Sequence, residues 1–174
     1  GACYYQLGEF EKAYKYLNYS IGMNCNEFAE ANALHFLSII KFNHNEIDGA
    51  IQYAKRQIEI SRKFNFFEYE ALGYRLLGDI MFSKNRYKDA VDNYEKGVSL
   101  LEKIGEKLIY FSVCKKIINS YERMGETTKS NALYKKLYDE HIMHLEKEAH
   151  LKIEQIDIEY ETERIKKEID AEKQ

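Results

Sequence analysis

The stretch that decides the fold is NRYKDAVDNYEKG, residues 85–97, because near-copies of it recur along the chain. The copies are GEFEKAYKYLNYS at 8–20, NEIDGAIQYAKRQ at 45–57 and, more loosely, GETTKSNALYKKL at 125–137. Each copy has a small residue at the same place, and these residues follow one another at intervals of 37, 40 and 40 positions: Ala13, Ala50, Ala90 and Ser130. A fixed period in this range is typical of a helical solenoid.

Each unit is predicted to contain a helix A, a short turn and a helix B. The turns LGEF, HNEI, KNRY and MGET hold a glycine or asparagine, which suits the left-handed conformation that ends a helix. The chain has no proline, which agrees with uninterrupted helices. Helix axes approach closely only where small residues meet, so Gly78 of helix A is expected opposite Ala90 of helix B. The predicted helices are 1–7, 10–22, 27–43, 46–63, 67–83, 87–103, 108–124 and a last one from about 127.

The third unit carries a resemblance to a known family. Tyr74, Leu77 and Gly78 stand where the tetratricopeptide repeat has W-x-x-L-G in helix A, and Tyr87 and Ala90 follow at the family's offsets. The resemblance covers about residues 1–140 and implies an all-α, right-handed α–α solenoid of helical hairpins. The period exceeds the family's usual ~34 residues, so the helices are expected to be longer by part of a turn. The implied units are 1–26, 27–66, 67–106 and 107–140, followed by an extended charged helix at 141–174.

The resemblance also implies a ligand groove, because helix A of each unit lines the concave surface in this family. Rings there can bury apolar side chains, amides can bond a peptide backbone, and arginine can hold a carboxylate. The expected occupant is an extended peptide or a partner helix, and the alternative is that the face packs on its own chain or a neighbouring subunit. A carboxylate clamp that some members use is incomplete, since only Lys115 with Asn119 fits its spacing. The implied groove residues are Tyr5, Gln6, Asn32, His35, Ile39, Phe42, Asn43, Leu72, Arg75, Asp79, Phe82, Ser83, Lys115, Asn119, Glu122 and Arg123.

The last helix differs from the others, because no glycine or proline occurs in the 49 residues after Gly125. A coiled-coil heptad is imperfect there, since Lys152 and Glu159 interrupt it and Ile158, Ile165 and Ile169 lie off the stripe. A single charged helix and a weak dimeric connector both remain open. The partial apolar stripe contains Ile142, Leu145, Ala149, Ile156 and Tyr160.

The stretch EYETERIKKEI, residues 159–169, is similar in style to the helix that follows the repeats in a group of bacterial sensors. In those proteins a transmembrane segment and a histidine-kinase or helix-turn-helix output domain come next, and the repeats face the periplasm. The resemblance implies the sensing region of a larger signalling protein, of which this chain is a fragment. A free-standing adaptor, which would place the chain in the cytoplasm, is the alternative.

Composition argues against other classes of function. The net charge is −3 with both signs mixed, whereas a nucleic-acid binder would show a basic patch. No catalytic motif is present, so we expect no enzyme activity and no cofactor. The cysteines are too far apart for a C-x-x-C site, and buried small side chains are expected at Cys3, Cys25 and Cys114. His141 and His144 lie three residues apart, with His150 on another face, which does not make a metal site.

Overall fold

The computed structural model describes residues 1–23 and 26–172, with side chains to residue 166. Within these residues every regular element is a helix, so the all-α prediction is confirmed. The predicted helix bounds agree with the observed ones to within a residue, and α2, α3 and α5 match at both ends. The helices are α1 (Ala2–Gln6), α2 (Phe10–Gly22), α3 (Glu27–Asn43), α4 (Ile47–Lys63), α5 (Phe67–Ser83), α6 (Tyr87–Ile104), α7 (Lys107–Arg123) and α8 (Thr127–Glu172).

The described turns between helices share one backbone motif. A residue with positive φ follows each helix end. Its own amide and the amide of the next residue donate to carbonyls of the last turn, as the Asn45 amide does to Phe42 and the Glu46 amide to Lys41. This is the Schellman pattern, which satisfies carbonyls that the helix leaves open. The predicted left-handed turns are therefore confirmed, and two further ones appear between units. The positive-φ residues are Gly8, Asn45, Asn65, Asn85, Gly105 and Gly125.

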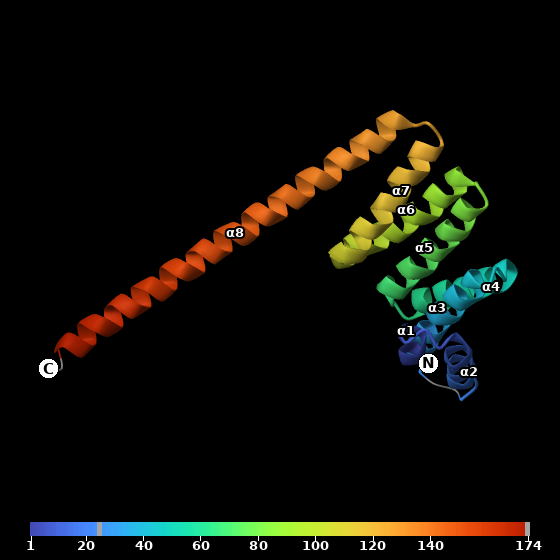
Figure 1. Cartoon of the computed structure of the whole chain (residues 1–174), viewed down its shortest axis with the longest axis horizontal. Helices are drawn as coiled ribbons and strands as arrows, with labels where there is room; N and C mark the ends of the chain where they lie inside the picture. Colours follow the sequence, from blue (N-terminus) through green and yellow to red (C-terminus); the bar gives the residue numbers. More distant parts are fainter. Residues whose placement is uncertain (24–25, 173–174) are drawn as a thin grey trace. The chain divides into compact units, whose positions relative to one another are not determined.

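The turn residues from Asn45 onward follow one another every 20 positions, which gives helices of 17 or 18 residues in α3 to α7. This length confirms the expected lengthening of the repeat. Consecutive helices from α1 to α7 pack as antiparallel hairpins, and Figure 1 shows α3 to α7 laid against one another in chain order. The A helices also touch across units, α1 with α3 and α3 with α5. These three A helices carry most of the predicted groove residues, and the others lie on α7.

Glycines allow the helices to approach closely, but the predicted contact between Gly78 and Ala90 is replaced by one between Gly78 and a different residue of α6. A Cβ on Gly78 would lie 2.4 Å from the ring of Tyr94, so Gly78 makes room for that ring rather than for Ala90. Gly97 lets α6 approach the backbone of α5, where its Cβ would lie 3.1 Å from the carbonyl oxygen of Ala71. Ala90 itself is fully buried. The small residue of helix B is therefore a core position, and the glycine of helix A admits a large side chain one turn further on.

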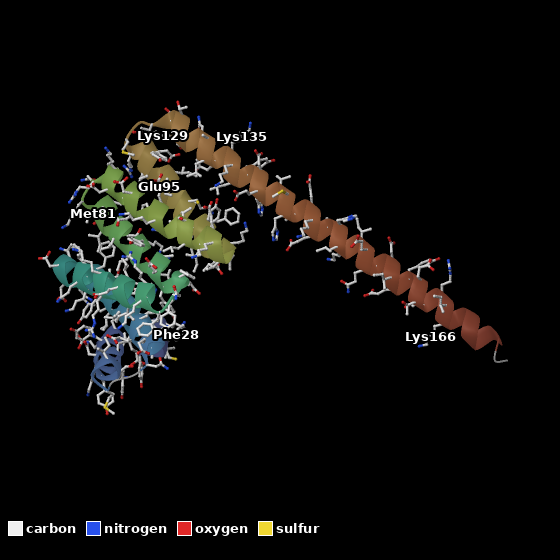
Figure 2. The ribbon with its side chains drawn as sticks, turned by 180° about the vertical axis from the view of Figure 1, so that it is seen from behind. Phe28, Met81, Glu95, Lys129, Lys135 and Lys166 are labelled. Carbon is white, nitrogen blue, oxygen red and sulfur yellow. The ribbon has the colours of Figure 1, made fainter. Side chains whose placement is uncertain are left out.

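The chain divides into two compact units, Gly1–Asn131 and Ala132–Gln174. The first contains the hairpins, which we call the solenoid, and the second consists of the continuation of α8. Helix α8 is one unbroken helix of 46 residues, about 70 Å at 1.5 Å per residue. Figure 2 shows its side chains spreading on all sides of the helix as far as Lys166. The predicted boundary at residue 140 stays a prediction.

Two properties of the described residues bear on the sequence predictions. Cys114 is buried as expected, but Cys3 is exposed because α1 is a short helix without buried residues. Cys25 lies outside the described residues, as does the side chain of Ile169. In the described part of the chain, no helix combines the length and apolar character that crossing a membrane requires.

Candidate ligand-binding groove

The centre of the A-helix face is a polar cluster around Asp79 of α5. The hydroxyl of Tyr94, from α6, donates to Asp79 Oδ1 at 2.7 Å, and Lys116 Nζ of α7 lies 2.8 Å from the same oxygen. Burial, followed by the negative charge of Asp79, raises the pKa of Tyr94 above its usual value, so the hydroxyl stays protonated and keeps donating. Three helices are thereby joined at one carboxylate, whose charge is compensated from within the fold.

A cavity of about 290 Å³ opens beside this cluster. Three aromatic residues line it: Phe42 of α3, Phe82 of α5 and Tyr94 of α6. Polar groups form the rest of the lining: Asp79, Ser83, Lys116 and Asn119. The structure therefore brings together five residues singled out from the sequence, Phe42, Asp79, Phe82, Ser83 and Asn119. Their role as ligand contacts stays a prediction.

A second polar pair lies at equivalent positions of α3 and α5, 40 residues apart. His35 is 9% exposed, and neither its Nδ1 nor the buried Nε of Arg75 has a hydrogen-bond partner among the described residues. Burial, and then the positive charge of Arg75, lower the pKa of His35 to about 4. The charge of Arg75 also acts on Tyr94, so the guanidinium influences both sides of α5. A cation whose buried donor lacks a partner among the described residues can bind an anionic group, because leaving a buried donor unsatisfied is costly.

The remaining predicted groove residues have other surroundings. Tyr5 packs its ring 5.1 Å from that of Phe36, Ile39 packs on the core cluster between α4 and α5, and Asn32 donates to the hydroxyl of Tyr69. These three contribute to packing as well as to the face. Leu72 is buried, and five residues are exposed on the surface: Gln6, Asn43, Lys115, Glu122 and Arg123.

Two cavity residues were missed by the sequence reasoning. Lys115 was predicted because it stands 40 residues after Arg75, but its neighbour Lys116 is the lysine that lines the cavity. Tyr94 is absent from the predicted groove residues, because only helix A was expected to line the groove. The signal for Tyr94 is the pairing of a large ring in helix B with a glycine in the facing helix A, where the neighbouring unit has Ala54 and Ser38.

The histidines of α8 make pairs along their own helix. His144 Nδ1 lies 3.7 Å from Glu148 and His150 Nε2 lies 3.3 Å from Glu154, each four residues further on. Among the residues that the structure describes, no group of three or more His, Cys, Asp or Glu side chains is placed to hold a metal ion.

Comparison with known proteins bears on the fold. No family model matches the sequence, and no curated protein matches it. Two crystal structures of the "nearly identical TPR-like repeats" of a "putative kinesin light chain" from Podosopora anserina, one of them a point variant, are similar to this chain. Each has a TM-score of 0.61 and 15% identity, over 78% of this chain and 68% of the other. The predicted fold, a right-handed solenoid of tetratricopeptide-like hairpins followed by a long helix, is therefore confirmed.

Proposed function

We propose that the solenoid binds an extended segment of a partner protein along its A-helix face. The observation that carries this proposal is Arg75, whose half-buried guanidinium has no ion-pair partner in the part of the chain that the structure describes. It lies one helical turn before Asp79, which lines the aromatic-walled cavity. Buried polar groups in proteins are normally satisfied, so a cation left open at a surface is best explained by a ligand that completes it.

The chemistry of the face defines the segment it fits. The cavity between Phe42 and Phe82 suits one large apolar side chain, since about 290 Å³ is near the lower limit of small-ligand pockets. Asn119 offers an amide for the ligand backbone. Asp79 is already compensated by Lys116 and Tyr94, so it does not demand a cation from the ligand. The preferred segment carries a bulky apolar residue and, nearby, a carboxylate that reaches Arg75.

His35 makes this binding dependent on pH. A carboxylate at Arg75 would favour the protonated form of His35 and raise its pKa from about 4. Binding would then take up a proton, so the affinity should increase as the pH falls from about 6.5 toward 4. The increase should disappear in His35→Gln, whose side chain does not titrate.

The test selects peptides from a random library with the whole chain and measures their affinity by calorimetry. We expect selected peptides to combine an acidic and a bulky apolar residue, and Arg75→Gln to weaken them at least tenfold. Lys55→Gln, which removes an exposed lysine from α4, is the matched control and should leave the affinity within about twofold. Peptides without acidic residues, or equal affinity for Arg75→Gln and the unaltered chain, would contradict the proposal.

We further propose that the chain is the sensing region of a larger bacterial signalling protein, with α8 as the connector to a membrane span and an output domain. The continuity of α8 over 46 residues supports this, because an unbroken helix can transmit a movement along its axis. Removing residues 146–174 should then change self-association or output of the intact protein. If neither changes, the alternative holds, namely a free-standing adaptor that binds its partners through the solenoid alone.

A further inference from the structure

The exposed part of α8 carries an apolar stripe with a spacing that is not a heptad. Continuing a heptad from Ala149 leads to Lys152 and Glu159, whereas steps of 3, 4, 4, 3 and 4 residues reach apolar side chains throughout. Such spacing follows an 11-residue repeat of about 3.67 residues per turn, close to the 3.6 of a straight helix. We call these residues the 142–160 stripe: Ile142, Leu145, Ala149, Ile153, Ile156 and Tyr160.

The stripe is continuous and open to solvent. At about 100° per residue its members fall within a sector about 80° wide, and they extend over about 27 Å of helix. Leu145, Ile153, Ile156 and Tyr160 are 46% to 67% exposed. Water-exposed apolar side chains in a row on one helix face are typical of a surface that docks another helix.

A second set of apolar residues in α8 lies on the opposite face. Leu151, Ile158 and Ile165 follow one another every seven residues and point about 180° away from the 142–160 stripe. They are as exposed as the stripe, at 50% to 67%. This arrangement explains why one heptad cannot contain all the apolar residues of α8, and it supplies a matched set of control positions.

The charges beside the stripe are almost all negative. The two flanks, within about 60° of the stripe, hold five carboxylates between residues 139 and 160, and Lys152 at one margin is the only lysine there. Among the described residues, neither Glu146 nor Asp157 has an ion-pair partner. The five carboxylates of the flanks are Asp139, Glu146 and Asp157 on one side of the stripe, and Glu148 and Glu159 on the other.

We propose that the 142–160 stripe docks a basic amphipathic helix of another protein. A second copy of this chain would fit the apolar side chains. In a parallel pair, however, Glu146 and Asp157 would face one lysine, Lys152, and two further carboxylates, Glu148 and Glu159, and the like charges destabilise such a pair. A helix of about 19 residues with lysine or arginine on both sides of an apolar stripe matches the length and neutralises the flanks. This surface is separate from the groove, so the proposal does not rest on the function proposed for the solenoid.

The test uses the whole chain and two synthetic amphipathic helices with the same leucine stripe, one flanked by lysine and one by glutamate. Binding is followed by fluorescence anisotropy at low and high salt. We expect the lysine helix to bind at least tenfold more tightly than the glutamate helix, and to weaken in high salt. The double variant Ile153→Ser with Ile156→Ser should reduce binding at least tenfold, whereas Leu151→Ser with Ile158→Ser should change it less than twofold.

A matched pair of charge variants distinguishes binding through the flanking carboxylates from a general attraction of the lysine helix to the acidic residues of α8. Glu146→Lys with Asp157→Lys should reduce lysine-helix binding at least tenfold, whereas the same change of charge at Glu154 and Glu161, which lie outside the two flanks, should reduce it less than threefold. Equal losses in the two charge variants, equal binding of the two helices, or no binding of the lysine helix would overturn the proposal. So would sedimentation showing a dimer that Ile153→Ser with Ile156→Ser dissociates, because the occupant is then a second copy.

Discussion

The solenoid and the helix beyond residue 131 contain similar apolar residues, but these residues have different surroundings. In the solenoid, Leu34, Leu37 and Ile80 are fully buried between helices. In α8, Leu151 and Ile153 are more than half exposed. A helix in the solenoid is therefore held by the core that neighbouring units share. From Met143 onward the described side chains of α8 are exposed, and this part depends on its own backbone hydrogen bonds and on side-chain pairs such as Gln155 with Glu159.

This difference predicts two kinds of stability in one chain. Units that share a core unfold together with their neighbours, so a substitution that destabilises one unit lowers the stability of the whole solenoid. A helix without a core opens locally and can fray without affecting the rest. The same substitution should therefore have very different consequences in the two regions, and that contrast can be measured.

The largest expected effect is a leucine truncation made once in each region. Leu34→Ala removes a fully buried side chain and should reduce the free energy of unfolding by about 2–5 kcal/mol. Leu151→Ala removes a half-exposed side chain and should change it by less than about 0.5 kcal/mol, because alanine is a good helix former. Urea titrations followed by circular dichroism measure both. Comparable losses in the two variants would show that α8 shares a core.

The next effect concerns pH and is confined to the solenoid. The pKa of His35 is lowered from 6.5 to about 4 in the folded chain. As the pH falls, His35 is therefore protonated at a higher pH in the unfolded chain than in the folded chain. Its contribution to stability is complete above about pH 6.5 and is lost as the pH falls to about 4, which amounts to about 3 kcal/mol. His35→Gln should lack this loss, and His150→Gln in α8, as the control, should keep it. The measurement is the urea midpoint of each variant between pH 4 and 7.5; identical profiles for all three proteins would contradict the prediction.

Much of the fold could be predicted because its determinants are local and repeated. The turn residues at Asn45 and Asn85 are recognisable from backbone preference alone, and the spacing of Ala50 and Ala90 gives the period. Cys3 was predicted to be buried and is exposed, because residue type does not say how much neighbouring structure covers a short helix such as α1. The repeat spacing in the sequence therefore predicts the structure where the packing of helices repeats, and it does not predict burial where the packing does not repeat.

The candidate site was less predictable, because it depends on which side chains reach across between helices. Phe42 and Phe82 follow from their register in helix A, but Tyr94 comes from helix B and reaches the cavity only because Gly78 leaves space. The choice between Lys115 and Lys116 depends on a rotation of about 100° about the α7 axis. Sequence register alone does not fix such a rotation, because it is set by how α7 packs on α6.

A smaller effect is expected from two glycine substitutions in the solenoid. Gly78→Ala would place a Cβ 2.4 Å from the buried ring of Tyr94, and the displaced ring would lose its bond to Asp79. The expected cost is about 1–3 kcal/mol after the helical preference of alanine is counted. Gly49→Ala places its Cβ 3.5 Å from Lys41, an ordinary contact, and should stabilise by up to about 1 kcal/mol.

Thermal unfolding compares the two glycine variants, and Tyr94→Leu tests the cause. If the ring is the obstacle, Gly78→Ala should cost less in the Tyr94→Leu background, and this coupling is measured by a double-mutant cycle. Additive losses would show that Gly78 is needed for a reason other than space for the ring.

The smallest expected effect lies in α8 and tests whether its stability is local. Ala149→Gly lowers helical preference by about 1 kcal/mol, which corresponds to roughly fivefold faster exchange of nearby amides. The described residues around position 149 are exposed, so this part of α8 opens locally. The change should therefore affect only amides near residue 149. Hydrogen exchange followed by mass spectrometry measures it, with the peptides of α5 as the internal control. Faster exchange in α5, or a lower urea midpoint of the whole chain, would mean that α8 and the solenoid unfold as one body, and the contrast between the two regions would then be one of exposure and not of stability.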